Sequence, residues 1–160
     1  MNIFVLDESP LIAAQMLCDC HIRKMCVETA QILSGVMLRR GIALREGMPN
    51  PQNLNHPVIV AAEVQSGLNW LFECNFLLHR EYSFRFGKEH KYSKFAAAYQ
   101  WNIGFTLKID CATLAKCCGG LDVSGLDIVS AYRKYYLEVK KPALQAKGLW
   151  HFTSRKDWTI

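Results

Sequence analysis

The sequence has no long apolar segment of the kind that crosses a membrane. No apolar run approaches the roughly 20 residues that a membrane-spanning helix requires. Residues 1–7 have neither the basic start nor the long apolar stretch and small-residue cleavage site of a secretory signal. We therefore expect a cytoplasmic protein with no membrane partner.

The sequence also lacks the short motifs of several enzyme classes. It contains no G-x-G-x-x-G, no G-x4-G-K-[ST], no H-E-x-x-H and no G-x-S-x-G. At the level of motifs, this excludes dinucleotide-binding proteins, P-loop proteins, zinc proteases of that type and α/β-hydrolases. No cluster of carboxylates indicates a magnesium-dependent nuclease. Any catalytic site must therefore use a less common combination of residues.

The seven cysteines lack the spacing of a structural zinc site. Zinc proteins usually carry C-x2-C pairs, whereas the close pairs here are Cys18-x-Cys20 and the adjacent Cys117-Cys118. In a protein without a secretory signal, thiols usually stay reduced and pack as small apolar side chains. We therefore expect no disulfide, no bound metal and no other cofactor.

Composition and helix signals together predict the fold. The chain has 160 residues, of which 51% are hydrophobic and 21% charged, as expected for one folded domain over residues 1–160. Ser9-Pro10 is a typical helix start, because proline suits the first helical position. We predict an all-α or mostly α, compact, single-domain helical bundle with a short extended N-terminal segment. The predicted helical stretches are residues 10–40 (one helix, or two with a joint near 18–20), 57–86, 88–99 and 127–140.

Positive charge is concentrated in the second half of the chain. Residues 1–79 carry 5 Lys/Arg and 7 Asp/Glu, whereas residues 80–160 carry 14 and 7. Basic residues interleaved with aromatic ones suit a phosphate backbone and stacked bases, which makes DNA the expected partner. The alternative is a solvated basic surface over a core of aromatic side chains. We predict phosphate contacts from Arg133, Lys140 and Lys141.

The first long helical stretch carries a row of mixed polar residues. His21, Lys24, Glu28 and Gln31 have the spacing i, i+3, i+7 and i+10, which places them within about 80° of arc on a helix. An imidazole, an amine, a carboxylate and an amide on one face could form an active site. We predict that Glu28 is the catalytic carboxylate with His21 and Lys24 beside it, and that Gln31 binds substrate. The alternative is an ordinary helix edge with a weak Lys24–Glu28 pair.

The tripeptide Asn55-His56-Pro57 marks a second candidate. His56 stands just before a helix, where the positive helix end lowers the pKa of an imidazole and favours the neutral base. We predict that His56 is a second catalytic acid or base and that Asn55 binds substrate. The alternative is a turn with a weak helix cap.

A third candidate is the segment that joins two predicted helices after residue 80. Arg85, His90 and Lys91 could bind an anionic ligand, and Tyr82 could stack on it or donate a hydrogen bond. We predict that these four residues contact substrate. The alternative is an exposed, charged turn between helices.

Several motifs together resemble a group of small, mostly uncharacterised phage and environmental proteins, and more distantly the pyrimidine dimer DNA glycosylases of the T4 endonuclease V type. This resemblance covers most of the chain and implies a phage protein in the host cytoplasm. The motifs are Ala14-Gln15, Cys18-Asp19-x-His21-x-x-Lys24-Met25-x-x-Glu28-x-x-Gln31, Asn55-His56-Pro57, Asn69-Trp70-Leu71, Glu81-Tyr82-x-x-Arg85, His90-Lys91 and Ala131-Tyr132-Arg133-x-Tyr135-Tyr136.

The resemblance implies a function in DNA repair or modification. Those glycosylases are all-α, metal-free enzymes in which the N-terminal amine attacks sugar C1′ and forms a Schiff base, assisted by a glutamate on an early helix. Here the implied glutamate is Glu28, and the amine is that of residue 1 or 2. We therefore expect a base-processing enzyme that cleaves an N-glycosidic bond of DNA, with or without strand incision. The alternatives are an enzyme that uses the same site on a free nucleotide or nucleoside, and a non-catalytic phage interaction protein.

Overall fold

The structure of the protein is a computed structural model, and it describes residues 1–103 and 108–159. Helices and turns dominate these residues, and no β-strand occurs among them, which confirms the predicted all-α fold class. No helix in the described part of the chain is long and apolar enough to cross a membrane. The elements are α1 (Pro10–Gln15), α2 (Asp19–Arg39), α3 (Pro57–Ala61), α4 (Gln65–Phe86), η1 (Ser93–Phe95), α5 (Ala96–Ile103), α6 (Ile128–Tyr135), η2 (Tyr136–Lys140) and α7 (Lys141–Gln145).

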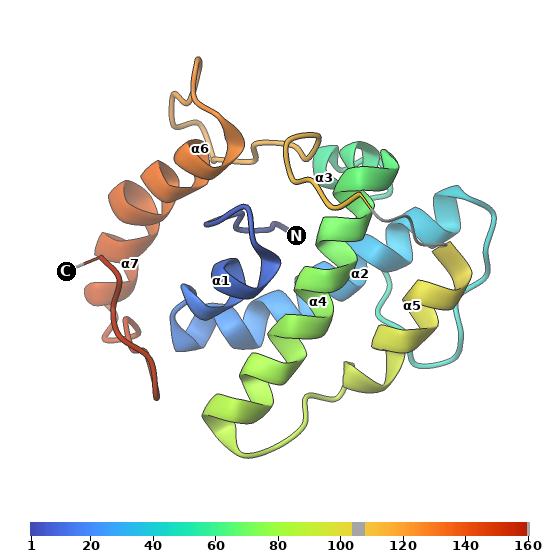
Figure 1. The fold of residues 1–160 in the computed structure, drawn as a ribbon, viewed down its shortest axis with the longest axis horizontal. Helices are drawn as coiled ribbons and strands as arrows, with labels where there is room; N and C mark the ends of the chain where they lie inside the picture. Colours follow the sequence, from blue (N-terminus) through green and yellow to red (C-terminus); the bar gives the residue numbers. More distant parts are fainter. Residues whose placement is uncertain (104–107, 160) are drawn as a thin grey trace.

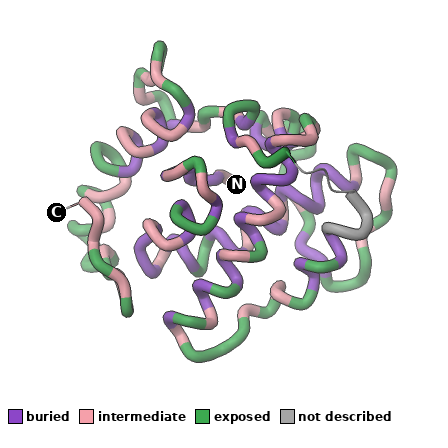
Figure 2. The backbone as a smooth tube through the Cα atoms, viewed as in Figure 1, coloured by how far each residue is buried: buried purple, intermediate pink, exposed green. Residues whose placement is uncertain are grey.

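The two longest helices, α2 and α4, pack against each other and carry much of the core (Figure 1). Buried positions are concentrated along both helices, as Figure 2 shows. The α4 helix ends at Gly87, which has a φ of +64°, a left-handed conformation that glycine adopts without strain. At the other end, Gly67 lies so close to Thr113 that a Cβ atom would come within 2.5 Å of its hydroxyl oxygen.

The first predicted helical stretch is two helices, which agrees with the second of the two alternatives. The joint lies at Met16–Cys18, between α1 and α2. The guanidinium of Arg85 donates hydrogen bonds to the carbonyl oxygens of Gln15 (2.9 Å) and Leu17 (2.7 Å). These bonds satisfy carbonyl groups that the interrupted helix leaves without helical partners.

The helix predicted over residues 127–140 begins close to the expected position, but the helical segment continues past residue 140 to Gln145. Asp127 caps α6 by accepting a hydrogen bond from the N–H of Ser130 at 2.8 Å. The chain then widens into a π-helical turn over η2 and continues as α7, so Pro142 does not end the helical segment. Because proline has no N–H to donate, the regular α-helical ladder is interrupted just before it.

The N-terminal segment is extended, as predicted, and it lies inside the molecule. Ile3, Phe4, Val5 and Leu6 are all buried, with exposed fractions of 5% or less. Figure 1 shows this segment in the middle of the fold, between α6 on one side and α2 with α4 on the other. The beginning of the chain is therefore surrounded by segments that are remote in sequence.

Candidate functional site

The amino group of Met1 lies beside the carboxylate of Glu28, near the middle of α2. Its nitrogen is 4.0 Å from Glu28 Oε1, and the backbone N–H of Asn2 donates a 2.8 Å hydrogen bond to Oε2. The Nζ atom of Lys24 is 3.4 Å from Oε1. The Glu28 side chain is 13% exposed and that of Lys24 is 59% exposed. A carboxylate at the edge of the core thus meets an α-amine and a lysine at the same oxygen, Oε1.

Met1 is anchored through its side chain, which is only 1% exposed. The residue as a whole is nevertheless half-buried, so the part that reaches solvent is its main chain. The amino group belongs to this solvent-reaching main chain.

Asn2 fixes the start of the chain to a distant loop. Its side-chain amide donates to the carbonyl oxygen of Cys117 at 2.9 Å. Tyr132 supports the same loop, because its hydroxyl donates to the carbonyl of Ala115 at 2.8 Å and accepts the Cys117 N–H at 3.1 Å. The Tyr132 hydroxyl is also 3.4 Å from Asn2 Oδ1. Tyr132 is fully buried, so this loop and the first two residues are held together from within the core.

His56 belongs to the same neighbourhood. It is the N-cap residue of α3, and its Nδ1 accepts the N–H of Val58 at 3.3 Å. Burial lowers the pKa of His56, the positive amino group of Met1 lowers it further, and Glu28 opposes the shift. The pKa of His56 is thus lowered, as the sequence predicted, but the causes are burial and the charge of the Met1 amine. Glu28 therefore contacts both the amino group of Met1 and Lys24, and the charges of Met1 and Glu28 act on His56.

His21 does not join this group, although the helical spacing predicted that it would. Its ring is 5% exposed, lies 2.8 Å from the hydroxyl of Tyr136 through Nδ1, and packs on Phe4. The reason is that His21 stands at the edge of the polar row, next to the buried apolar face of α2. The N-terminal segment and the C-terminal helical region cover that edge. His21 is therefore a core histidine with a partner, and the prediction of a catalytic role is corrected.

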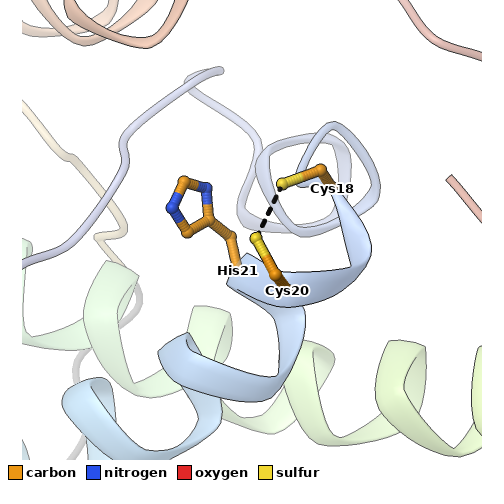
Figure 3. Close-up of side chains that lie close together, drawn as sticks. All are labelled: Cys18, Cys20 and His21. Carbon is orange, nitrogen blue, oxygen red and sulfur yellow. Dashed lines mark hydrogen bonds between the residues drawn. The ribbon is translucent and has the colours of Figure 1, made fainter. Parts of the chain in front are cut away.

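Figure 3 shows His21 beside Cys18 and Cys20 at the start of α2. The two sulfur atoms are 3.5 Å apart, and the Tyr136 hydroxyl is 3.3 Å from the Cys18 sulfur. The hydrogen bond from Cys20 lowers the pKa of Cys18 to about 4 against the effect of burial, with His21 contributing in the same direction. The pKa of Cys20 is raised in turn. The polar groups of this cluster are partners for one another.

Arg85 was predicted to bind phosphate, but its side chain is completely buried. Its Nε donates to Glu81 at 2.7 Å and one terminal nitrogen contacts Asp19 at 3.0 Å. Its other bonds go to the carbonyl groups at the joint between α1 and α2. Because these bonds occupy the guanidinium, Arg85 joins helices and has no donor directed to solvent. The prediction of a substrate contact is corrected for this residue.

The neighbours of Arg85 in the predicted anion site are divided between core and surface. Tyr82 is 9% exposed and packs edge-on against Phe86 and His90, which removes it as a platform for a stacked base. His90 is half-buried, and burial lowers its pKa. Lys91 is exposed and lies over the ring of Tyr92 at 4.6 Å. Lys91 alone of these predicted contacts is fully accessible.

The remaining predicted substrate contacts lie at or near the surface. Gln31 is half-buried, one helical turn beyond Glu28, and donates to the carbonyl of Asn50 at 3.2 Å. The exposed Asn55 accepts a 3.1 Å hydrogen bond from Arg39. Gln31 thus follows Glu28 on α2, and Asn55 directly precedes His56 before α3.

The three basic residues predicted to bind phosphate in the C-terminal part differ in availability. Arg133 donates to the carbonyl of Leu6 at 2.7 Å and pairs with Asp7 at 3.0 Å. Lys141 bonds the Thr159 hydroxyl at 2.6 Å. Lys140 lies 4.9 Å from the centre of the Tyr135 ring, which leaves its ammonium group able to pair with an anion. Of the three, Lys140 is therefore the one with its charge most available, because the other two already hold parts of the fold together.

No family model, curated protein or solved structure matches this chain. The function is therefore argued from the site alone. The sequence singled out Glu28, Lys24 and His56, but it did not indicate that Asn2, Cys117 and Tyr132 position the amino group. Those three residues are far apart in the chain, and no short motif connects them.

Proposed function

We propose that the protein is a base-processing enzyme that cleaves the N-glycosidic bond of DNA, with the amino group of Met1 as nucleophile. The observation that carries this proposal is the 4.0 Å approach of that amino group to Glu28, which also accepts the N–H of Asn2. A fixed amine beside a carboxylate is suited to attack on an electrophilic carbon, because the carboxylate can accept the ammonium proton.

In the first step, Glu28 takes a proton from the Met1 ammonium group, and the free nitrogen lone pair attacks C1′ of the sugar. The bond from C1′ to the base breaks, and the base leaves with the bonding electrons and gains a proton. Opening of the sugar ring then gives an iminium ion between the Met1 nitrogen and C1′. The leaving base takes the proton from Glu28, the ring oxygen takes one from the attached nitrogen as the ring opens, and the restored carboxylate then stabilises the charge of the iminium ion.

His56 supplies the second proton-transfer group. Its lowered pKa favours the neutral ring, and once Nδ1 gives up the 3.3 Å bond from the N–H of Val58, that nitrogen can remove a proton from C2′ of the iminium ion. The electron pair released there expels the phosphate on the 3′ side and cuts the strand. Water then hydrolyses the iminium ion and restores the amine. Without this elimination, hydrolysis of the iminium ion leaves an abasic site.

Borohydride trapping tests the nucleophile directly. Incubated with a duplex that carries an abasic site, the protein should form a covalent adduct after reduction, and peptide mapping should locate the adduct on Met1. Glu28→Gln should reduce trapping, and one extra residue before Met1 should move the amine and abolish it. Glu46→Gln is the matched control, because Glu46 is exposed in a loop. An adduct on a lysine, or none with any abasic substrate, would refute the proposed nucleophile.

A second measurement tests DNA as the substrate. Affinity for duplex DNA should fall with salt, with a log–log slope of roughly −0.9 for each phosphate contact. The double variant Lys140→Glu, Lys141→Glu should make that slope shallower. If the protein cleaves a free nucleoside and does not bind DNA, then its substrate is the nucleoside. Absence of both activities would leave a non-catalytic interaction protein.

A further inference from the structure

A thiol and two imidazoles converge on the side of α2 that faces away from Glu28. Cys26 on α2, His79 on α4 and His90 in the loop after α4 each offer one ligand atom, and these atoms lie within 4.8 Å of one another. Residues 26 and 28 of a helix point about 200° apart, so this cluster is separate from the Met1–Glu28 site. Cys26 is fully buried and His79 is 4% exposed.

His79 has an unusual environment for a buried histidine. Neither of its ring nitrogens has a hydrogen-bond partner among the described residues. Whichever tautomer is present, one nitrogen carries a proton and the other a lone pair, and both have lost their contact with water. Buried polar groups are nearly always paired, so an unpaired imidazole in the core indicates a missing ligand.

We propose that Cys26, His79 and His90 bind a Zn²⁺ ion. Thiolate sulfur and imidazole nitrogen are both ordinary zinc ligands, and a site with three protein ligands keeps a fourth position for water. On binding, the Cys26 thiol releases its proton to solvent as the sulfur–zinc bond forms, and the two imidazoles each donate a lone pair. The oxidation state of every atom is unchanged.

The site has a path from the surface. His79 lies in the wall of a surface pocket of about 280 Å³, together with Ser83 and Glu89. Because both ring nitrogens of His79 are closed to solvent, its ring must turn for an ion to enter from this pocket. Glu89 and Arg80 stand in the same wall, so their opposite charges offset each other there.

Binding of zinc requires a small movement of the ligand side chains, and His90, which lies in a loop, can make it. Zinc bonds of about 2.0–2.3 Å put tetrahedral ligand atoms roughly 3.3–3.7 Å apart, inside the 4.8 Å limit within which the three atoms now lie. His90 stands in a loop, and its ring can approach more easily than a side chain on a helix. Its Nδ1 accepts a 3.3 Å hydrogen bond from the N–H of Tyr92, and zinc binding replaces this long bond.

The cluster at the start of α2 shows why sequence spacing is a poor guide here. Cys18, Cys20 and His21 are adjacent in sequence and also lie within 4.8 Å of one another, but Tyr136 already bonds His21 and Cys18. Zinc would have to displace that hydroxyl. In the proposed site, two of the three ligands come from segments more than 50 residues beyond Cys26, and His79 has no partner to lose.

Metal titration of the full chain tests the proposal. The protein is dialysed against a chelator and titrated with Zn²⁺ in competition with a chromophoric chelator. Titration with Co²⁺ then reports the ligands, because a thiolate ligand adds a charge-transfer band in the near ultraviolet. We expect one equivalent of metal with that band. Cys26→Ser should abolish the band and the stoichiometric binding, whereas the control Cys18→Ser, Cys20→Ser should retain both.

His79→Gln should also abolish stoichiometric binding. If that variant fails to fold, His90→Gln tests the same site from a loop position. Folded wild-type protein that binds no Zn²⁺ would overturn the proposal. Metal binding that survives Cys26→Ser but is lost in the Cys18→Ser, Cys20→Ser control would also overturn it, because the ion would then occupy the other cluster.

Discussion

Glu28 and Glu81 lie on the two longest helices and both have basic partners, but they are held in different ways. Glu81 is 5% exposed and accepts three hydrogen bonds of 2.7–2.8 Å, one from Arg85 and two from Arg155. Glu28 accepts one short bond, from the N–H of Asn2, and its contacts with the Met1 amine and Lys24 are longer.

The number and length of these hydrogen bonds decide whether a carboxylate can still accept a proton. A carboxylate has two oxygens and about four lone-pair directions. Arginine donors occupy those of Glu81 in a fixed geometry, so this residue serves structure. Glu28 has free capacity on the oxygen that faces the amine, so it can accept a proton or meet a ligand.

Replacing Arg85 should have the largest effect on stability. Arg85→Met leaves Glu81 and Asp19 without their buried cation, and loss of one partner from a buried pair typically costs about 3–5 kcal/mol. Denaturant unfolding measures this change. Arg155→Met is the matched control, because its side chain is 29% exposed and a smaller loss is expected. Equal losses in the two variants would contradict the assignment of Arg85 as the structural cation.

Glu28→Gln should have the opposite profile, with a large loss of activity and a small loss of stability. Removing a proton acceptor from the reaction should lower the rate by on the order of a hundredfold or more. Unfolding free energy should fall by less than about 1 kcal/mol, because the amide oxygen can still accept the N–H of Asn2. Kinetics on the true DNA substrate and denaturant unfolding measure the two effects. An unchanged rate would remove Glu28 from the mechanism.

Acid should weaken the Glu81 cluster. Burial by itself would raise the pKa of Glu81, but the hydrogen bonds from Arg155 and Arg85 prevail and hold it below its ordinary value of 4.5. The ionised form is therefore favoured in the folded state, and this stabilisation is complete above pH 4.5 and lost as the pH falls through the lower, folded-state pKa. Unfolding measured between pH 7 and pH 3 should show the loss. Glu81→Gln should be less stable at neutral pH and less sensitive to acid. If the unfolding free energies of the variant and the wild type fell equally with pH, this account would be contradicted.

Lys24→Met should have the smallest effect on stability. The lysine is mostly exposed and forms an i,i+4 pair with Glu28, which is worth less than about 0.5 kcal/mol. Thermal or denaturant unfolding should barely distinguish the variant from the wild type. A loss of unfolding free energy near that of Arg85→Met would mean that the contacts of Glu28 stabilise the fold as much as those of Glu81.

Much of the fold could be predicted from the sequence because its signals are local. Ser9-Pro10, His56-Pro57 and Gly87 mark helix ends through backbone preferences that depend on neighbouring residues only. Pro142 was less informative, because the π-helical turn before it accommodates a residue without an N–H.

The site was predictable only in part, because burial depends on tertiary packing. Glu28 and His21 occupy the same helical row, but the segment that covers His21 comes from elsewhere in the chain. Arg85 has the charge of a phosphate ligand, and only its partners at the joint between α1 and α2 reveal its structural role. A spacing rule cannot distinguish such cases, since it contains no information on what packs over a helix face.

The buried N-terminal segment also has a consequence for how the chain is made. Asn2 meets Tyr132, which lies 130 residues further along the chain. At 5–20 residues per second, the ribosome would release the two about 7–26 s apart. During that interval Phe4 lacks its partners Tyr132, Tyr135 and Tyr136, and contacts over so long a separation form slowly. The N-terminal segment is thus among the last parts of the chain to reach its full set of contacts.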